Sequence, residues 1–519
     1  MKKKSLKQNT LILTITGFIV KSIGFVYRIY IANSIGAEGM GLYQLVLPIY
    51  NLVLLGLTAG AGIAISRLVA EETARGNEKN SKRIAITAGT VIFIAAFVTV
   101  SILMLNLDFV ANVLVADMRT KNSLMYLLPS IPFIAAITSF KGYFYGKQDV
   151  VPNALSQIAE QMTKLFVVFA IADIFAHGDL ERKCLFATIG LVTGEIANVL
   201  VVYIAFLIKR NPKSKIINEP HMKKRDICKS ILKISLPITA NRLILSLLGT
   251  VEFILIPQRL ALYGLTNAES LAEYGKLTGM AAPVVYFPSM LTGALATALV
   301  PAIAEAVAMK RVTSANRQIS RSIRVTLVFG FLFTSFFVSF STDIAELIYP
   351  GQSVGTMLFL LSFTGSFFYL QQTLYGVLNG LGKETTTLKH SMITSVMRLG
   401  FVWFAIPYYG MFAYIAALII TNLIGSILNL RATIKATGMS IEIGDWLIKP
   451  LIAALSGAIA APVMKSLINS IIHSQPIAVL VSGCIVGGIM VIMLVLMGVF
   501  ELKDLKQMLP FHIEKYRKF

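Results

Sequence analysis

The sequence predicts an all-α integral membrane protein with fourteen transmembrane helices. Hydrophobic residues make up 56% of the 519 residues and charged residues only 14%, whereas about 25% of the residues in a typical soluble domain are charged. The mean hydropathy is +0.73. A chain of this length has too few charged side chains to cover a soluble surface. The composition therefore excludes a soluble enzyme, a disordered protein and a fibrous protein.

Fourteen mostly apolar stretches are long enough to cross a bilayer, which takes about 20 residues. The first follows MKKKSLK and resembles a signal peptide, but Lys21 and Arg28 interrupt it and no small-residue cleavage site follows. We therefore expect a retained first helix. The stretches lie at about 9–32, 40–65, 84–106, 122–141, 154–174, 185–208, 232–262, 277–303, 325–347, 356–379, 390–408, 411–430, 450–472 and 477–500.

Lysine and arginine divide unequally between the loops on the two sides of these stretches. Of the 47 Lys and Arg residues, 35 lie in segments on one side, 5 lie on the other and 7 lie within the stretches. Because basic residues accumulate in cytoplasmic loops, we expect a multi-pass protein of the inner membrane with both termini in the cytoplasm. This distribution accounts for the net charge of +21 without a nucleic-acid partner.

Sequence motifs for nucleotide use, catalysis and metal binding are missing. The run KGYFYGK from Lys141 to Lys147 has neither the glycine spacing nor the Ser or Thr of a phosphate-binding loop. Cys184, Cys228 and Cys484 are scattered, which argues against a disulfide framework and a zinc site. We expect no cofactor, no metal and no catalytic residue, so the chain is not expected to be an enzyme. Transport would depend on an ion gradient, a substrate gradient or the membrane potential.

Short matches recur along the chain in the same order, at offsets of 231 to 236 positions. They pair Arg28 and Tyr43 with Arg259 and Tyr274, Pro48 with Pro283, Ala70-Glu71 with Ala304-Glu305, and Gly146-Lys147 with Gly382-Lys383. They predict two six-helix halves that are parallel repeats and enclose a central cavity. The predicted organisation is an N-terminal half at 1–208, a basic cytoplasmic linker at 209–231, a C-terminal half at 232–436, two additional helices within 437–500 and a cytoplasmic tail at 501–519.

Charged residues inside the apolar stretches are candidates for function, because a charge at mid-bilayer costs about 2.5–3.5 kcal/mol. Lys21 and Arg28 are seven positions apart, so they share one helix face. They either line a cavity or extend to the two headgroup layers. Glu252 and Arg259 have the same spacing, in a stretch that also contains Arg242. They either serve a cavity or form an internal salt bridge.

Three further positions are candidates for gating or for charge pairing. Glu160 and Lys164 are four positions apart and can neutralise each other, which favours a structural role. Glu195 and Arg398 have no partner nearby on their own helices, and pairing across helices stays open. The candidate substrate-binding residues are Lys21, Arg28, Arg242, Glu252, Arg259 and Lys276, and the gating or pairing candidates are Glu160, Lys164, Glu195 and Arg398. The excess of cations suits an anionic, phosphate-bearing substrate.

Several segments resemble the polysaccharide-exporter families of the multidrug/oligosaccharidyl-lipid/polysaccharide flippase superfamily. They are GFVYRIYIANSIGAEGMGLYQLVLPIY from Gly24, SRLVAEETARGN from Ser66, GYFYGKQDVVPNALSQIAEQ from Gly142 and EYGKLTGM from Glu273. The resemblance covers essentially the whole chain. It implies an alternating-access flippase for a lipid-linked (polyprenyl-pyrophosphate) cell-wall oligosaccharide, such as a peptidoglycan precursor for the spore cortex. Membrane lipids and cell-wall synthesis enzymes are the partners that it implies.

The lipid II flippases among these families use a cation, a Gly-Phe pair and a second cation in their first helix. Lys21, Gly24-Phe25 and Arg28 are similar, with one extra residue before the second cation. These flippases also have a basic residue at the start of their eighth helix, and Lys276 lies close to that place. Their basic position in the second helix falls near Asn51 and Leu52, which are uncharged. Their sodium site needs acidic residues in the seventh and eleventh helices. The eleventh stretch has no carboxylate here, so sodium coupling is not expected; its polar residues are Ser391, Thr394, Ser395 and Arg398.

Three alternatives remain. A multidrug exporter of the same superfamily would need a cavity of the opposite charge for organic cations. A membrane-embedded glycosyltransferase would need a carboxylate in an accessible loop, and the outward carboxylates follow no recognisable motif; they include Asp108, Asp117, Asp179 and Glu269. The third is a scaffold that recruits wall-synthesis enzymes.

Overall fold

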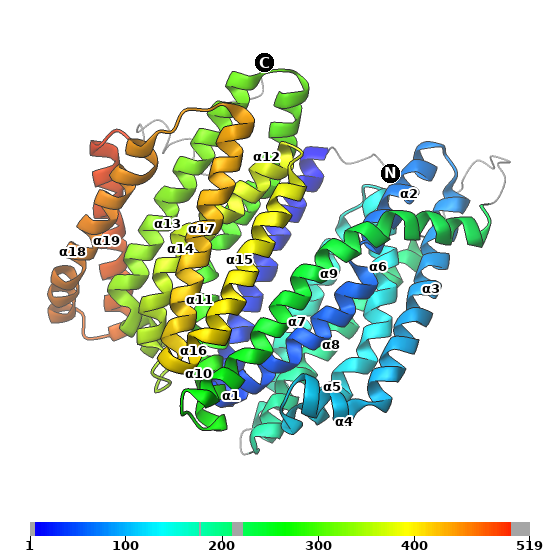
Figure 1. The fold of residues 1–519 in the computed structure, drawn as a ribbon, viewed down its shortest axis with the longest axis horizontal. Coiled ribbons are helices and arrows are strands. Elements are labelled where there is room, and N and C mark those ends of the chain that lie inside the picture. Colours follow the sequence, from blue (N-terminus) through cyan, green and yellow to red (C-terminus); the bar gives the residue numbers. More distant parts are fainter. Residues whose placement is uncertain (1–5, 176–177, 210–221, 500–519) are drawn as a thin grey trace. The chain divides into compact units, whose positions relative to one another are not determined.

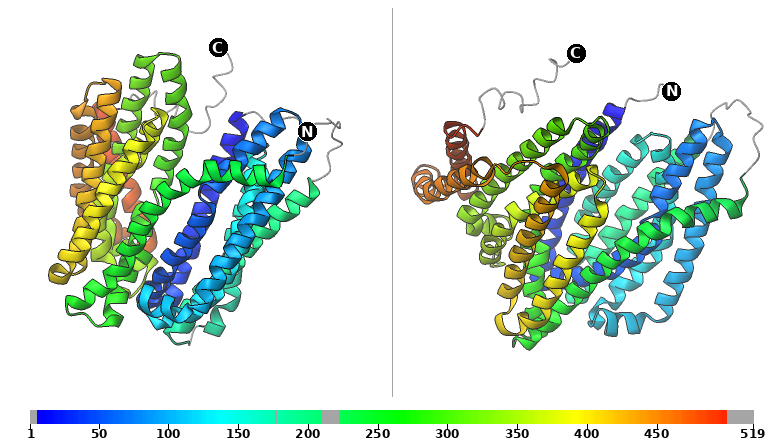
Figure 2. Two further views of the ribbon diagram at one scale, coloured as in Figure 1. Left: turned by 45° about the vertical axis from the view of Figure 1, so that its right-hand side comes forward. Right: turned by 45° about the horizontal axis from the view of Figure 1, so that its top comes forward.

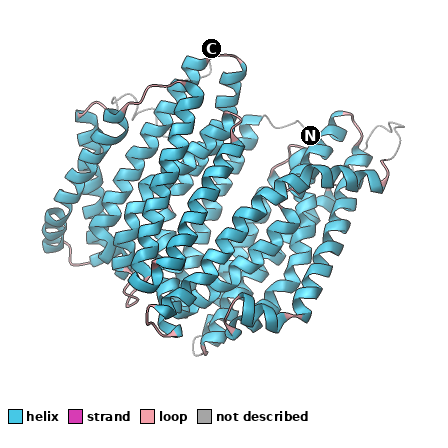
Figure 3. Ribbon diagram, viewed as in Figure 1, coloured by secondary structure: helices cyan, strands magenta, loops and turns pink. Residues whose placement is uncertain are grey.

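The structure is a computed structural model that describes residues 6–175, 178–209 and 222–499. In these ranges it consists of helices and connecting turns, without a strand (Figure 3). Most of the predicted linker and the predicted tail lie outside the described residues. The elements are α1 (Leu6–Thr58), α2 (Ala61–Ala74), α3 (Glu78–Leu105), α4 (Leu107–Phe109), η1 (Val110–Leu114), η2 (Met118–Thr120), α5 (Lys121–Leu127), η3 (Leu128–Ser130), α6 (Ile131–Gly146), α7 (Val151–Phe175), α8 (Leu180–Ile208), α9 (Lys224–Leu262), α10 (Asn267–Gly275), η4 (Lys276–Ala281), α11 (Ala282–Tyr286), α12 (Ser289–Ala308), α13 (Val312–Ile348), α14 (Gly355–Gly380), α15 (Glu384–Phe404), α16 (Ile406–Tyr409), α17 (Met411–Thr437), η5 (Gly444–Ile448), α18 (Lys449–Ile471) and α19 (Gln475–Leu496).

Ten helices within the described ranges are long and apolar enough to cross a membrane. One of them, Ile12–Ala74, contains the first two predicted stretches. Three further helices, α7, α14 and α15, occupy the fifth, tenth and eleventh predicted stretches and have 25, 26 and 21 residues. The all-α membrane architecture is confirmed, and the number fourteen stays a prediction.

The first two predicted stretches are separated by a backbone break at Gly36. Its φ is 73° and its ψ is −179°, which is outside the helical region. Glycine adopts positive φ without steric cost because it has no Cβ. The chain turns back at this point, between the dark blue start of α1 and the lighter part that leads to α2 (Figure 1). The break at Gly36 divides α1 into two helical parts, one for each of the first two predicted stretches.

The chain divides into two compact units. Unit 1 comprises Met1–Met280 and Leu399–Met411, and unit 2 comprises Ala281–Arg398 and Phe412–Phe519. The candidates on α1, α7, α8, α9 and η4 therefore belong to unit 1, including both Arg28 and Arg259. Arg398 is the last residue of its segment of unit 2. The division into two six-helix halves stays a prediction.

Each unit has its own apolar core. Ile65, Ile84, Phe144, Val202 and Ile227 bring α2, α3, α6, α8 and α9 together in unit 1. Small residues allow this close approach: a Cβ added at Gly142 of α6 would lie 3.0 Å from the carbonyl oxygen of Gly62 in α2. A second core in unit 2 joins α12, α13, α14 and η5 through Ile303, Ile323, Leu374 and Trp446.

Large apolar side chains also lie exposed on the outside of the helices. Phe97, Phe166 and Ile459 are 58%, 74% and 74% exposed. A soluble protein rarely exposes extended apolar surface, whereas a transmembrane helix needs it against lipid. The exposed residues are therefore those expected to contact the bilayer.

The ends of two pairs of helices repeat at one fixed offset. Residues 75–77 after α2 and residues 309–311 after α12 make the same backbone hydrogen bonds, with donors and acceptors all 234 positions apart. Residues 147–149 after α6 and 381–383 after α14 do the same, again at 234 positions. This offset equals that of the Ala70-Glu71 and Ala304-Glu305 match. It supports an internal repeat, and it makes Leu381, rather than Lys383, the structural counterpart of Lys147.

Helix α9 is 39 residues long and contains Pro237 and Pro257. Proline removes a backbone donor and disfavours a straight helix. The green ribbon of α9 changes direction along its length in all three views (Figures 1 and 2). Helix α9 is therefore bent, and it carries Arg242, Glu252 and Arg259.

Candidate functional site

The side chain of Arg28 is bound inside unit 1. Its Nη2 donates to the carbonyl oxygen of Thr278 at 2.9 Å, and its Nε donates to that of Gly279 at 3.3 Å. Both acceptors belong to η4, a single turn of π-helix. A π-helix shifts the backbone hydrogen bonds from i+4 to i+5, so carbonyls near its ends can accept from side chains. This contact favours the interpretation that Arg28 acts within the protein over the one in which it reaches the headgroups.

Polar side chains from three elements surround this contact. The Nε2 of Gln44 also donates to the Thr278 carbonyl, at 3.3 Å. Glu252 of α9 is 2% exposed, and both Glu252 and Arg28 act electrostatically on the buried hydroxyl of Tyr274. A buried carboxylate and a guanidinium near one phenol form a polar centre, because buried charges need compensation. Arg28, Gln44, Glu252, Tyr274 and Thr278 are called the unit 1 polar centre below.

Arg259 stacks against an aromatic ring instead. Its guanidinium carbon lies 3.3 Å from the centroid of the Trp403 ring. Trp403 belongs to Leu399–Met411, the segment by which the chain returns to unit 1. A cation above the face of tryptophan is attracted by the ring quadrupole. Arg259 therefore holds this returning segment against α9.

The other three candidates differ in their surroundings. Lys276 pairs with Glu273, with 3.1 Å between Nζ and Oε1. Lys21 and Arg242 are exposed. On the face of Lys21, Gly17 has open space beside it, but a Cβ at Gly24 would lie 3.2 Å from the Oε1 of Gln161.

The start of α10 is fixed by a capping box. Thr266 accepts from the backbone N–H of Glu269, and the Glu269 carboxylate accepts from the backbone N–H and the hydroxyl of Thr266. These hydrogen bonds, first the one from the backbone N–H, lower the pKa of the exposed Glu269 carboxyl. The box sets where α10 begins and so positions Tyr274 and η4.

A second polar cluster of unit 1 joins α7 and α8. The Nζ of Lys164 lies 2.5 Å from the Oε1 of Glu160, so the predicted i,i+4 pair is formed. Asn198 Nδ2 donates to Glu160 at 2.9 Å and to Glu195 at 3.3 Å. Glu195 was predicted to have no partner nearby on its own helix; Asn198 of that helix binds it and links it to Glu160 of α7. Lys164 and Asn198 are buried. We name Glu160, Lys164, Glu195 and Asn198 the α7–α8 cluster.

Two features of the α7–α8 cluster were not predicted. Lys141, at the end of the fourth predicted stretch, lies inside α6 and acts electrostatically on Glu195. The predicted end of that stretch is too early, because α6 continues to Gly146. Gly194 leaves room for the lysine: a Cβ there would lie 2.2 Å from the Cγ of Lys164. With Lys141 of α6 beside it, the cluster brings two carboxylates and two lysines near one asparagine.

Arg398 of unit 2 lies on the polar face of α15. Its Nη2 is 3.5 Å from the hydroxyl of Ser395. On the same helix, Ser391 is hydrogen-bonded to Tyr375 of α14 at 3.0 Å, and His390 to Asn429 of α17 at 2.8 Å. This face therefore joins three helices through neutral and cationic groups.

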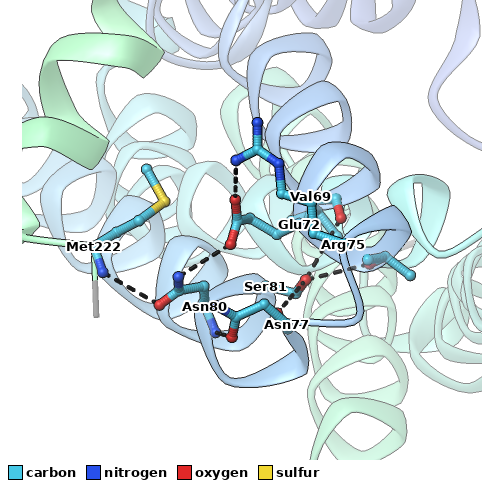
Figure 4. A network of polar contacts seen from close by, with 8 residues as sticks. Val69, Glu72, Arg75, Asn77, Asn80, Ser81 and Met222 are labelled. Carbon is cyan, nitrogen blue, oxygen red and sulfur yellow. Dashed lines mark hydrogen bonds and ion pairs between the residues drawn. The ribbon is translucent and has the colours of Figure 1, made fainter. Parts of the chain in front are cut away.

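A polar network fastens the beginning of α9 to the hairpin of α2 and α3 (Figure 4). The carboxylate of Glu72 is 5% exposed and accepts from Arg75 at 2.9 Å and from Asn80 at 3.0 Å. The Asn80 Oδ1 accepts from the backbone N–H of Met222 at 3.3 Å. These bonds fix the start of the helix that carries Glu252 and Arg259.

In the described residues, no group of three or more His, Cys, Asp or Glu side chains could hold a metal ion.

Unit 1 also has a cavity of about 590 Å³ beside α9 and α10, lined by Asp117, Arg119, Gln258 and Asn267 among others. Arg119 pairs there with Asp117 at 2.7 Å and with Glu38 at 3.3 Å. Of these residues, only Asp117 was considered from the sequence, as one of the outward carboxylates.

The sequence profile of the polysaccharide biosynthesis protein family matches residues 6–307. The chain belongs to this family. The matched part contains every candidate of unit 1, from Lys21 to Lys276. Because the profile covers more than half of the chain, the predicted resemblance to polysaccharide exporters is confirmed.

Relatives and solved structures agree with this family. Stage V sporulation protein B of Bacillus subtilis (strain 168) is 28% identical over 468 residues, which cover 90% of each chain. The structure of the lipid II flippase MurJ in an inward closed conformation gives a TM-score of 0.71 at 14% identity, covering 96% of this chain and all of the other. An inward-facing multidrug resistance transporter of the MATE family in the MOP superfamily gives 0.66 at 15% identity, covering 80% and 95%. The two structures establish the fold, and the chain is a multi-pass membrane protein.

Proposed function

We propose that this protein is an alternating-access flippase for a lipid-linked cell-wall oligosaccharide that carries a polyprenyl pyrophosphate. One observation carries the proposal. Five of the six substrate-binding candidates of unit 1 are cations and one, Glu252, is a carboxylate, and Lys276 also pairs with Glu273; the cations are Lys21, Arg28, Arg242, Arg259 and Lys276. A charge excess of this sign suits a pyrophosphate, and arginine offers a planar pair of donors for it.

The relatives narrow the substrate. Stage V sporulation protein B, which aligns over 90% of both chains, is by its name a sporulation protein, and MurJ, whose fold is similar, is named a lipid II flippase. We therefore propose a peptidoglycan precursor for the spore cortex as the substrate. Cell-wall synthesis enzymes are the proposed partners, and membrane lipids surround the polyprenyl chain.

The remaining assignments follow from this proposal. The substrate is moved and not chemically changed, so we propose no enzymatic step and no cofactor. We place the protein in the cytoplasmic membrane with both termini in the cytoplasm, on the basis of the distribution of basic residues. The six substrate-binding candidates and the α7–α8 cluster remain proposed sites.

A multidrug exporter is the second candidate, because the fold is shared with a multidrug resistance transporter. The same cationic excess argues against it for organic cations, which would be repelled. A glycosyltransferase or a scaffold of wall synthesis would leave the intramembrane cations without a role.

A complementation experiment separates these candidates. The protein is expressed in Bacillus subtilis that lacks stage V sporulation protein B, and the cortex and the drug susceptibility are both measured. We expect restored cortex and unchanged drug susceptibility. Drug resistance without restored cortex would favour the exporter. Polymer formed from the precursor by the purified protein would favour the glycosyltransferase.

A further inference from the structure

A second basic site lies in unit 2, away in sequence from every candidate above. A cavity of about 640 Å³ opens between the beginning of α13, the segment 438–442 before η5, and Val499 after α19. Three arginines line it from α13: Arg317, Arg321 and Arg324. They are four and three positions apart, so they form one stripe along the helix. We call this cavity the arginine pocket.

The wall opposite this stripe is held by a chain of hydrogen bonds. Glu442 accepts from Arg324 at 2.9 Å and from the hydroxyl of Ser320 at 3.0 Å, and Ser320 accepts from the indole N–H of Trp446 at 3.3 Å. Trp446 is buried. Arg324 is therefore fixed in place, whereas Arg317 and Arg321 are exposed on the pocket side of α13.

The arginine pocket is cationic overall. Arg324 is also 3.3 Å from Asp445, which pairs with Lys449 at 2.6 Å. The two carboxylates, Glu442 and Asp445, thus face three arginines and one lysine. In addition, the Nε of Arg324 is buried without a hydrogen-bond partner among the described residues. A buried N–H normally has an acceptor, so the protein does not use the full hydrogen-bonding capacity of Arg324.

The depth of the pocket indicates the source of that anion. Helix α13 has 37 residues, or about 55 Å at 1.5 Å per residue, whereas the hydrocarbon core is about 30 Å thick. The arginines of α13 occupy its first turns, and an apolar run begins at Val325. The arginines therefore lie at the headgroup level, on the side where the basic residues predict the cytoplasm. Val325, Met439 and Val499 add apolar wall, which suits the first part of an acyl chain.

We propose that the arginine pocket binds the phosphate group of an acidic phospholipid headgroup. Acidic lipids are enriched in the cytoplasmic leaflet, and basic pockets between helices at that surface attract them. Arginine binds phosphate through two parallel N–H donors. This site is separate from the proposed flippase function, and it depends neither on the unit 1 polar centre nor on the identity of the transported sugar.

Lipid binding by the full-length protein tests the proposal. Purified protein is titrated with phosphatidylglycerol or with phosphatidylcholine, and bound lipid is counted by native mass spectrometry. We compare the wild type with a double variant, Arg317→Gln with Arg321→Gln, in which Arg324 is kept because it supports Glu442. Each basic residue near an anionic surface contributes about a fivefold gain, so the pair should lower phosphatidylglycerol affinity about 25-fold. Phosphatidylcholine binding should be weaker and unchanged.

Two controls make the result specific. Lys224→Gln with Arg225→Gln removes the same charge from exposed positions on α9, outside the pocket, and should lower phosphatidylglycerol binding much less. Arg317→Lys with Arg321→Lys keeps the positive charge but loses the planar pair of guanidinium donors, so it should give an intermediate loss of phosphatidylglycerol affinity. This variant also serves as the test if the Gln variant folds poorly. Equal binding of phosphatidylglycerol by wild type and the Gln variant, or an equal loss in the α9 control, would overturn the proposal. Retention of pyrophosphate but not of phosphatidylglycerol by the wild type would identify a soluble phosphate as the ligand, and so contradict the lipid source.

Discussion

The Nη2 of Arg28 lies 2.9 Å from the carbonyl oxygen of Thr278, which is 250 positions later in the chain. Thr278 belongs to the π-helical turn η4, and the chain leaves unit 1 two residues further on, after Met280. Arg28 thus connects the first helix of unit 1 to the place where the chain passes into unit 2. A substrate anion that competes for this guanidinium would change the contact on η4.

Replacement of Arg28 should impair transport strongly. Arg28→Ala removes the guanidinium that is proposed to bind the substrate, and one charge-assisted hydrogen bond contributes about 1.5–3 kcal/mol. We expect a ten- to hundredfold lower rate of substrate movement at matched protein levels, with partial rescue by Arg28→Lys, which keeps the charge but loses the planar fork. The comparison is Arg242→Ala at an exposed position of α9, which should be milder. Wild-type transport by Arg28→Ala would show that this cation is dispensable.

Loss of one partner in the α7–α8 cluster should destabilise the protein. Lys164→Met leaves the Glu160 and Glu195 carboxylates without this cation at a site where Lys164 and Glu160 side chains are 10% and 12% exposed. Breaking a buried pair costs about 3–5 kcal/mol, measurable as a lower thermal unfolding midpoint in detergent. Adding Glu160→Gln should recover part of the loss.

A matched control exists for this prediction. Arg67 and Glu71 form the same i,i+4 arrangement, but their side chains are 67% and 46% exposed. An exposed pair contributes about 0–1 kcal/mol, so Arg67→Ala should change the midpoint little. Equal effects of Arg67→Ala and Lys164→Met would mean that burial of the cluster has no energetic consequence.

Arg259 and Trp403 should be energetically coupled. The stack is 3.3 Å from guanidinium to ring centroid, and Trp403 is 48% exposed, which corresponds to about 0.5–1 kcal/mol for a cation–π contact. Arg259→Ala, Trp403→Ala and the double variant form a cycle, read out as the free energy of unfolding. Trp403→Phe should retain part of the coupling. Additive single effects would indicate that the two side chains do not support each other.

The orientation of the chain can be tested at the start of α9. After Cys184, Cys228 and Cys484 are replaced, a cysteine is introduced by Lys224→Cys at an exposed position. Because the basic residues predict the cytoplasm there, an impermeant thiol reagent should label it only after the cells are opened. Labelling in intact cells would reverse the predicted topology.

Local features of this fold could be predicted from the sequence, and distant contacts could not. The Glu160–Lys164 pair follows from i,i+4 geometry on one helix. The bend of α9 follows from its two prolines. Glu195, in contrast, is linked through Asn198 to Glu160 on another helix, and only tertiary packing, with Gly194 making room for Lys164, brings these residues together.

The same reason explains the partial prediction of the candidate site. Arg28 and Arg259 stand out because charges are costly in a membrane. Their contacts with Thr278 and Trp403 join residues more than 140 positions apart, and backbone carbonyls carry no signal in the sequence. Tyr274 was visible as one member of the repeated Arg-Tyr spacing, but not as a neighbour of Glu252. The end of the fourth predicted stretch, at Lys141, was placed too early because helix ends are poorly marked by composition.

Movement of substrate across a bilayer by the protein alone tests the central claim most directly. Proteoliposomes that contain only this protein and a fluorescently labelled polyprenyl-pyrophosphate sugar are prepared in sodium-free buffer, and the label reaching the outer leaflet is quenched or captured over time. Protein-free vesicles and vesicles with Arg28→Ala are measured in parallel. We predict that the wild type moves the label faster than both controls. We expect this without sodium, because the eleventh predicted stretch, 390–408, contains no carboxylate. A wild-type rate equal to that of protein-free vesicles, with or without sodium, would contradict the account.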